Sequence, residues 1–223
     1  MSTLASKKYH EIINRSFKKN LNILILKTIV EEKEYENVKH ILSVEHFRDF
    51  IRKMKIDPAF KEKYLDLDRK SHQCRSNKEN FEGLKIKEID EMFKIWLAEN
   101  KTKPFKDIYI LSFMKKEFFV KFYGNDSDHR SCHYCGISEK QIQQLIDKDE
   151  IKTKRLATRG RTMEIDRIRP NDDYDDANIV FCCYWCNNAK TDEFTEPEFL
   201  LVREQITQIW NNRLAKHGLG RIP

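Results

Sequence analysis

The sequence contains no apolar run that approaches the roughly 18 residues of a membrane-spanning helix. Its most apolar stretch, Leu21–Val30, is interrupted by Asn22, Lys27 and Thr28, and no small-residue cleavage site of a signal peptide follows it. We therefore predict a buried helix over this stretch, no membrane partner and a cytoplasmic location. Internal repeats and low-complexity tracts are also absent from the sequence.

The composition is that of a globular chain with a mildly basic balance. Hydrophobic residues make up 39% and charged residues 35% of 223 residues, enough for one large domain or two modest ones. The net charge of +6 says little alone, but five cations with no acid among them lie within residues 152–161. These residues are Lys152, Lys154, Arg155, Arg159 and Arg161. The cluster is either a solvated loop or, beside a metal site, a binding surface for nucleic-acid phosphates.

The first hundred residues predict helices, and the rest predicts mixed structure. Apolar residues recur at steps of three and four over 38–54 and again over 86–97, as on the buried face of a helix. An exposed connection is expected over 68–80, and Pro104 marks the boundary between an N-terminal domain (1–104) and a second domain (105–223). In the second domain we expect an aromatic-rich helix from about Lys106 to Tyr123, a charged helix over 139–149 and two short strands around 159–161. Thr195 to Glu198 has the pattern of a capping box that begins a final helix, which Gly218 closes.

Four of the six cysteines form two Cys-x-x-Cys pairs, Cys132/Cys135 and Cys183/Cys186. In a Lys-rich chain without an export signal, this spacing favours a metal site over disulfides. Two such pairs can surround one tetrahedral zinc ion, and a closed four-cysteine site is structural, not catalytic. Cys74 and Cys182 have no spaced partner and are interpreted as ordinary thiols.

The residues between and after these pairs resemble a nuclease family. The sequence is similar to the ordered motif of the HNH superfamily of ββα-metal endonucleases. The motif consists of Asp166, which follows Glu164 by two residues and precedes Pro170, then Asn178, then Cys183-x-x-Cys186-Asn187-x-x-Lys190. The resemblance covers about residues 118–210 and none of the first hundred. It implies an α+β fold in which a helical N-terminal domain precedes a zinc-stapled ββα core and a C-terminal helix.

The resemblance also implies roles for individual residues. Asp166, at the end of the second hairpin strand, and Asn187, on the short helix after the second cysteine pair, would bind a catalytic Mg²⁺ or Mn²⁺ through oxygen atoms. Asn178 would tie the loop to the hairpin backbone, or would be a turn residue. Glu164 would orient neighbouring groups or form an exposed ion pair, and Lys190 would contact phosphate or simply end its helix.

Arg167 departs from the family pattern, because most members have a histidine general base directly after the metal aspartate. A guanidinium stays protonated and cannot accept a proton from water. Either Arg167 binds the scissile phosphate while another residue activates the water, or the site has lost catalysis and the chain only binds.

An Asp-Arg subclass that includes rare-cutting restriction endonucleases is similar to this chain in two further runs. The first is Phe122-Tyr123-Gly124 followed by Cys132-x-Tyr134-Cys135-Gly136-Ile137-Ser138, and the second is the tail Asn187-x-x-Lys190-x-Asp192-x-Phe194-x-x-x-Glu198. In that subclass a tyrosine at the position of Tyr123 takes part in the active site. A phenolate base is one interpretation of Tyr123 and a core aromatic is the other; His133 and His129 are further candidates for the base.

The favoured hypothesis is a metal-dependent endonuclease that cuts DNA and carries a structural zinc ion. The alternative is a catalytically inactive, zinc-stabilised nucleic-acid-binding module. A third possibility makes the helical half a partner-binding domain. A palindromic target would favour a homodimer.

Overall fold

A computed structural model describes residues 3–124 and 130–222. Contacts between Cα atoms divide the chain into two compact units, which we call the helical unit (Lys8–Met114) and the knuckle unit (Met1–Lys7 with Lys115–Pro223). These units are defined by contacts between residues. The domain boundary placed at residue 104 is defined by sequence signals, and it stays a prediction. No helix in the described ranges is long and apolar enough to cross a membrane.

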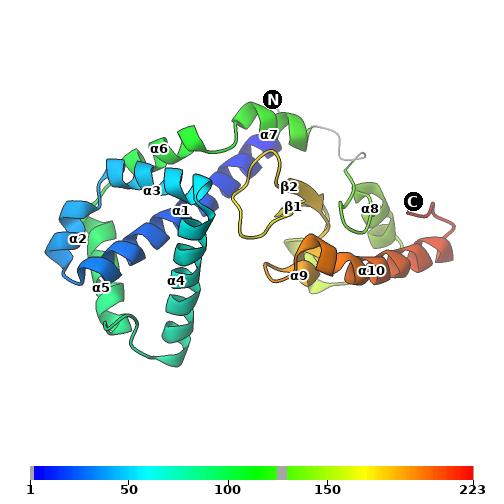
Figure 1. The fold of residues 1–223 in the computed structure, drawn as a ribbon. Coiled ribbons are helices and arrows are strands. Elements are labelled where there is room, and N and C mark those ends of the chain that lie inside the picture. Colours follow the sequence, from blue (N-terminus) through cyan, green and yellow to red (C-terminus); the bar gives the residue numbers. More distant parts are fainter. Residues whose placement is uncertain (1–2, 125–129, 223) are drawn as a thin grey trace. The chain divides into compact units, whose positions relative to one another are not determined.

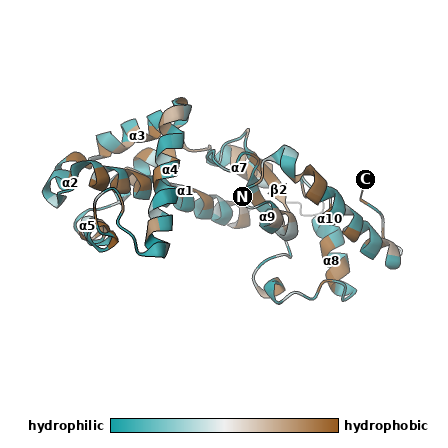
Figure 2. Cartoon of the chain, turned by 60° about the horizontal axis from the view of Figure 1, so that its bottom comes forward, coloured by the Kyte–Doolittle hydropathy of each residue, from teal (hydrophilic) through white to brown (hydrophobic). Residues whose placement is uncertain are grey.

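Six helices build the helical unit (Figure 1). They are α1 (Thr3–Glu32), α2 (Tyr35–Ile41), α3 (Val44–Ile56), α4 (Pro58–Asn77), α5 (Ile86–Glu99) and α6 (Lys103–Ser112), with the first residues of α1 belonging to the other unit. Figure 2 shows brown and teal residues along the same helices, as expected for helices that bury one face. The expected buried helix over Leu21–Val30 is confirmed as part of α1.

Two expectations for this half of the chain are wrong. The connection expected over 68–80 is helical as far as Asn77, because buried Ser71 and an Arg75–Asp90 ion pair hold this polar stretch in place. The single helix expected from Lys106 to Tyr123 is interrupted after α6, where Phe113 is extended. The next carbonyl, that of Met114, accepts a hydrogen bond from the Tyr9 hydroxyl (2.8 Å), so tertiary contact replaces the helical bond.

The knuckle unit holds the sheet and the remaining helices. Its elements are α7 (Lys116–Tyr123), α8 (Glu139–Asp147), a 3₁₀ turn η1 (Lys154–Ala157), β1 (Glu164–Arg167), β2 (Ile179–Cys182), α9 (Tyr184–Lys190) and α10 (Glu196–Lys216). The strands pair antiparallel, with Asp166 opposite Val180 and Ile165 opposite Phe181. The predicted α+β class is confirmed, since the described residues combine this small sheet with helices and a four-cysteine cluster.

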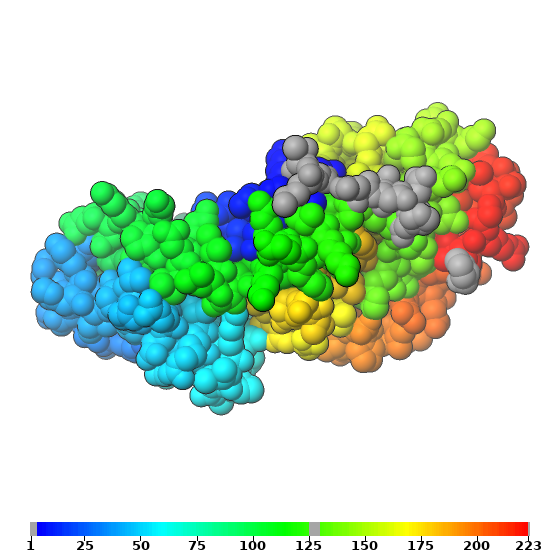
Figure 3. Space-filling model, turned by 90° about the horizontal axis from the view of Figure 1, so that it is seen from above, coloured from blue at the N-terminus to red at the C-terminus, as the bar shows by residue number. Residues whose placement is uncertain are grey.

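The strands do not lie where they were expected. Residues 159–161 form a turn with Gly160 at a φ of +91°, a left-handed conformation that a strand excludes. The hairpin instead begins at Glu164, so Asp166 lies on the first strand and not on the second. The capping box at Thr195 and Glu198 is confirmed as the start of α10. Figure 3 shows the C-terminal residues beside the α8 region, where the Gln141 side chain donates to the Gly220 carbonyl (2.9 Å).

Candidate functional site

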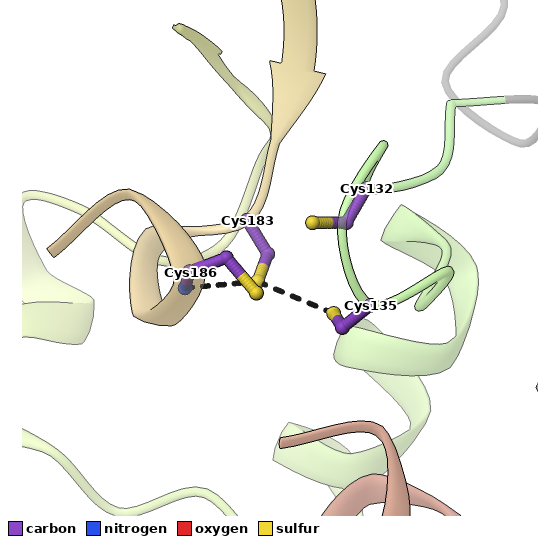
Figure 4. A group of neighbouring side chains, drawn as sticks. All are labelled: Cys132, Cys135, Cys183 and Cys186. Carbon is purple, nitrogen blue, oxygen red and sulfur yellow. Dashed lines mark hydrogen bonds between the residues drawn. The ribbon is translucent and has the colours of Figure 1, made fainter. Parts of the chain in front are cut away.

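Both cysteine pairs meet in one buried cluster (Figure 4). The sulfur atoms of Cys132, Cys135, Cys183 and Cys186 all lie within 4.8 Å of one another, and each residue is at most 2% exposed. The Cys135 and Cys183 sulfurs are 3.7 Å apart. Two ligands of a tetrahedral zinc ion with Zn–S bonds of ~2.3 Å would be separated by about that distance. The cluster therefore fits a zinc site.

Charge in the cluster supports the same fit. Hydrogen bonds from Cys135 first, then from Cys182, Cys183 and Cys186, hold the pKa of Cys132 well below its usual range. The Cys132 thiolate in turn raises the pKa of Cys183 and of Cys186. Four buried thiolates this close together require a cation between them.

Local backbone geometry aims these sulfurs at one another. In the first knuckle, the Gly136 amide donates to the Cys132 carbonyl (2.9 Å), and a Cβ at Gly136 would lie 2.5 Å from Ile222. In the second, the Cys183 sulfur accepts from the Cys186 amide (3.4 Å) and caps α9. The His133 amide donates to the Phe181 carbonyl (2.8 Å), which joins the first knuckle to β2.

Asp166 faces the knuckles from β1. Residues alternate between the faces of a strand, so Glu164 and Asp166 share one face and Arg167 points to the other. The Tyr134 hydroxyl donates to Asp166 Oδ2 (2.8 Å), and Lys190 Nζ lies 3.5 Å from the same oxygen. Burial and then the charge of Asp166 raise the pKa of Tyr134 above its usual range, so this hydroxyl stays protonated and donates.

Asn187 reaches the same face from α9, which packs on β1. Its side-chain amide donates to Glu164 Oε2 (2.5 Å), and Arg159 forms two bonds to the Glu164 carboxylate (2.6 and 2.5 Å). Because the Asn187 nitrogen is held by Glu164, the amide oxygen is the atom left to bind a cation. Glu164 therefore both forms an ion pair with one member of the basic cluster, Arg159, and contacts Asn187.

Arg167 makes its contacts with the loop between the strands and with the segment after α9. Its guanidinium donates to the Asp172 carbonyl (3.1 Å) and to Asp192 Oδ1 (3.2 Å), and lies over the Tyr174 ring. The side chain is 14% exposed. A guanidinium in this position carries a fixed positive charge at the edge of the site.

Asn178 is fully buried at the base of the loop between the strands. Its side chain accepts from the Arg169 amide (2.8 Å) and donates to the carbonyls of Arg169 (3.1 Å) and Asp173 (2.9 Å). The structure thus places three side-chain bonds of Asn178 on the backbone of the loop, the arrangement that a loop-tying role requires.

The candidates for the proton acceptor lie in different places. Tyr123, 2% exposed, packs edge-on against Phe181, whose side chain shares a hairpin face with Ile165 and not with Asp166. His133 is about one-third exposed, and its Nε2 lies 2.5 Å from Glu196 Oε1. His129 lies outside the described residues.

All five members of the basic cluster are exposed, and three of them contact other groups of the protein. Arg159 is tied to Glu164, and Arg161 donates to the Leu156 carbonyl (3.1 Å). Lys152 pairs with Asp149 (3.0 Å) at the surface. Lys154 and Arg155 lie exposed on η1, which makes them the members most accessible to a phosphate backbone.

The sequence motif includes Tyr134 but predicts no role for it in the site, and the contact of Lys190 with Asp166 was not foreseen. Both are buried, at 5% and 0% exposure, and both contact the carboxylate proposed to bind metal. A position inside a Cys-x-x-Cys pair signals only proximity to zinc. A carboxylate contact made across the fold has no sequence signal.

No protein-family model matches this chain, and no curated protein matches it in sequence. Among solved structures the chain is similar to the rare-cutting HNH restriction endonuclease PacI, whose structure was described for its mechanism of DNA perturbation. The match has 28% sequence identity, covers 48% of this chain and 68% of that chain, and has a TM-score of 0.39. The class is the one that the sequence motifs resemble. At this TM-score the likeness carries no argument about activity or the roles of residues.

Proposed function

We propose that this chain is a metal-dependent endonuclease of the HNH type that hydrolyses phosphodiester bonds of DNA. The observation that carries the proposal is the shared face of β1 and α9, where Asp166 and Asn187 each have one polar atom held by a protein partner. The carboxylate and amide oxygens that remain are hard ligands suited to Mg²⁺ or Mn²⁺. A purely structural hairpin has no need for this arrangement.

The ion bound there would neutralise charge on the phosphate and stabilise the departing oxygen. Asp166 and Asn187 hold two of its positions and leave the others to water and substrate. Arg167 points to the other face of β1 but reaches Asp192, just beyond α9, so it supplies a fixed positive charge at the edge of the site, where it would contact the scissile phosphate from the side away from the ion. Asn178 keeps the loop beside Arg167 in one conformation.

The proton acceptor is a separate question, for which Tyr123 and His133 are the proposals. A carboxylate at one imidazole nitrogen orients the ring and leaves the other nitrogen to accept a proton, and His133 has this arrangement with Glu196. Tyr123 is buried on the other side of β2, so its use as a base would require the helix that carries it to shift. Paired variants, His133→Gln and Tyr123→Phe, distinguish the two.

Zinc, in this proposal, holds both knuckles and takes no part in the chemistry. Lys154 and Arg155 would bind backbone phosphates, with Lys152, Arg159 and Arg161 supporting the same surface. Residues 1–104 are proposed to supply target contacts, since an HNH core grips DNA backbone and shape.

The test is cleavage of supercoiled plasmid by zinc-loaded protein with Mg²⁺ or Mn²⁺. We expect nicking or linearisation that EDTA and the substitution Asp166→Ala each abolish. Absence of cleavage on duplex DNA, single-stranded DNA and RNA, with DNA binding retained, would contradict the proposal and favour the inactive binding module.

A further inference from the structure

The Asp166 carboxylate is held by one oxygen atom. Among the described residues, its recorded hydrogen bond and ion pair both end on Oδ2, at 2.8 Å from the Tyr134 hydroxyl and 3.5 Å from Lys190 Nζ. The Asp166 side chain is 13% exposed, so access is limited. Two donors on one oxygen fix the rotation of the carboxylate and leave Oδ1 available as a ligand atom.

Each donor comes from an element that carries zinc ligands. Tyr134 lies between Cys132 and Cys135 in the first knuckle. Lys190 follows Cys186 by four residues on α9, one helical turn further along the same face. Removal of zinc would therefore loosen both supports of Asp166 at once.

The donors are themselves fixed by packing. The Tyr134 ring packs edge-on against Phe199 at 5.4 Å between centroids, and Lys190 Nζ lies 5.7 Å from the centre of the Tyr134 ring. Lys190 also donates to the Arg167 carbonyl (3.2 Å) and is fully buried. A lysine with no exposed surface and a carboxylate partner is expensive to bury, and its burial here points to a specific task.

We propose that Tyr134 and Lys190 are positioning residues through which the zinc site sets the affinity of the Asp166 site for its divalent ion. Zinc occupancy then controls cleavage through the position of Asp166, not only through stability. The inference rests on the proposed function, because it requires Asp166 to be a metal ligand.

The size of the expected effect follows from other metal sites. Groups that orient a metal ligand without touching the ion typically change metal affinity or activity ~10–100-fold when they are removed. The substitution Tyr134→Phe removes one hydroxyl and keeps the ring that packs on Phe199 and Lys190. It therefore separates orientation of Asp166 from the packing of the knuckle.

The experiment is a Mn²⁺ titration of the zinc-loaded full chain without DNA, with free Mn²⁺ followed by electron paramagnetic resonance. The proteins are wild type, Tyr134→Phe, Asp166→Ala and the matched control Tyr35→Phe, whose hydroxyl bonds Glu99 in the helical unit. Zinc content and thermal unfolding are measured on each. We expect Tyr134→Phe to weaken Mn²⁺ binding about tenfold or more, with zinc content unchanged and Tyr35→Phe equal to wild type. Raised Mn²⁺ should restore its cleavage rate.

The outcomes separate the two proposals. Loss of Mn²⁺ binding in Asp166→Ala with wild-type affinity in Tyr134→Phe would overturn this inference and leave the nuclease in place. Unchanged Mn²⁺ binding in Asp166→Ala would overturn the metal site itself. If Tyr134→Phe cleaves slowly and extra Mn²⁺ does not restore the cleavage rate, Tyr134 has only a structural role and the inference is overturned. If Tyr134→Phe does not hold zinc, the Mn²⁺ titration is made with the zinc-loaded fraction of Lys190→Met. The same outcomes then support or overturn the inference.

Discussion

The two units bury different kinds of polar side chain. In the described part of the helical unit, the buried polar residues are all uncharged: Ser16, Asn20, Thr28 and Ser71. In the described part of the knuckle unit, three of the four are charged: Arg130, Glu139 and Lys190, beside Asn178. Burial of charge costs several kcal/mol per ion unless the charge is well paired. The buried charges of the knuckle unit are therefore not explained by packing for stability alone.

The buried polar groups of the helical unit have hydrogen-bond partners within that unit. The hydroxyls of Ser16 and Tyr109 are 2.5 Å apart, and Thr28 donates to the Leu24 carbonyl. Charged side chains there pair at the surface, as Lys70 does with Asp66, and such pairs contribute little to stability.

Buried charged groups connect separate elements in the knuckle unit, whereas the Arg75–Asp90 pair that joins two helices of the helical unit is partly exposed. Glu139 on α8 pairs with Arg130 (3.3 Å) and accepts from the Met163 amide (2.6 Å), which joins the first knuckle to the start of the hairpin. Lys190 joins α9 to Asp166. The comparison indicates that the helical unit is built for packing and the knuckle unit for a site.

The largest effect is expected from removal of zinc. Structural zinc supplies roughly 10–16 kcal/mol of binding free energy that is also folding free energy. A strong chelator, or Cys135→Ser, should unfold the knuckle unit and leave the helical unit folded on its own core. Near-ultraviolet circular dichroism with hydrogen exchange would locate the loss. Simultaneous unfolding of both units would break the comparison.

Next in size is the loss of a buried charge. Lys190→Ala leaves Asp166 without its cation and should lower the free energy of unfolding by ~3–5 kcal/mol. The matched change in the helical unit, Ser71→Ala, should cost about 1 kcal/mol. Urea unfolding of zinc-loaded protein measures both, and equal losses would refute the distinction between the units.

Arg167→Lys tests the fixed charge beside the metal site. A lysine keeps the charge but loses the planar fork, so the cleavage rate should fall on the order of 100-fold. Mn²⁺ affinity should not change, because Arg167 points to the other face of β1. A parallel loss of Mn²⁺ affinity would assign Arg167 to the metal site instead.

A smaller effect is expected at the exposed cations of η1. The double substitution Lys154→Ala and Arg155→Ala should lower the slope of log binding constant against log salt by about 2, since each phosphate contact contributes ~0.9. Lys216→Ala, at an ion-paired position of α10 outside both proposed DNA-contacting regions, is the control. Binding to duplex DNA followed by fluorescence anisotropy supplies the slopes, and identical slopes for wild type and double variant would remove η1 from the interface.

The smallest expected effect is on acid stability. Hydrogen bonds from Lys216 and then His217 lower the pKa of Glu150 to about 2. A lowered pKa in the folded state stabilises above the ordinary value of 4.5 and loses that contribution as pH falls from about 4.5 to about 2. Glu150→Gln should therefore destabilise at pH 7 and flatten the pH dependence in that window. An unchanged profile in thermal unfolding would show that the carboxylate is not coupled to folding.

Sequence reasoning succeeded where the signal is local. Cys-x-x-Cys spacing predicted the cysteine cluster, and Thr195 with Glu198 predicted the start of α10. It failed where distant contacts decide, as in the polar end of α4, which the Arg75–Asp90 pair holds helical. The hairpin register depends on residues 12 to 18 positions apart, and the partners of Asp166 are more than 20 positions away. The roles of Asp166, Arg167, Tyr123, Asn178 and Asn187 stay predictions until activity is measured.

The most direct test of the account is the Mn²⁺ dependence of plasmid cleavage by zinc-loaded wild type and Asp166→Asn, which keeps the side chain's shape and removes its charge. We predict saturable, Mn²⁺-dependent cleavage by the wild type and none by the variant, with equal zinc content and with a variant that is less stable, because Lys190 loses its charged partner, but still folded at the assay temperature. Equal cleavage by both proteins, or none by either, would contradict the claim that the buried charges of the knuckle unit serve a catalytic metal site.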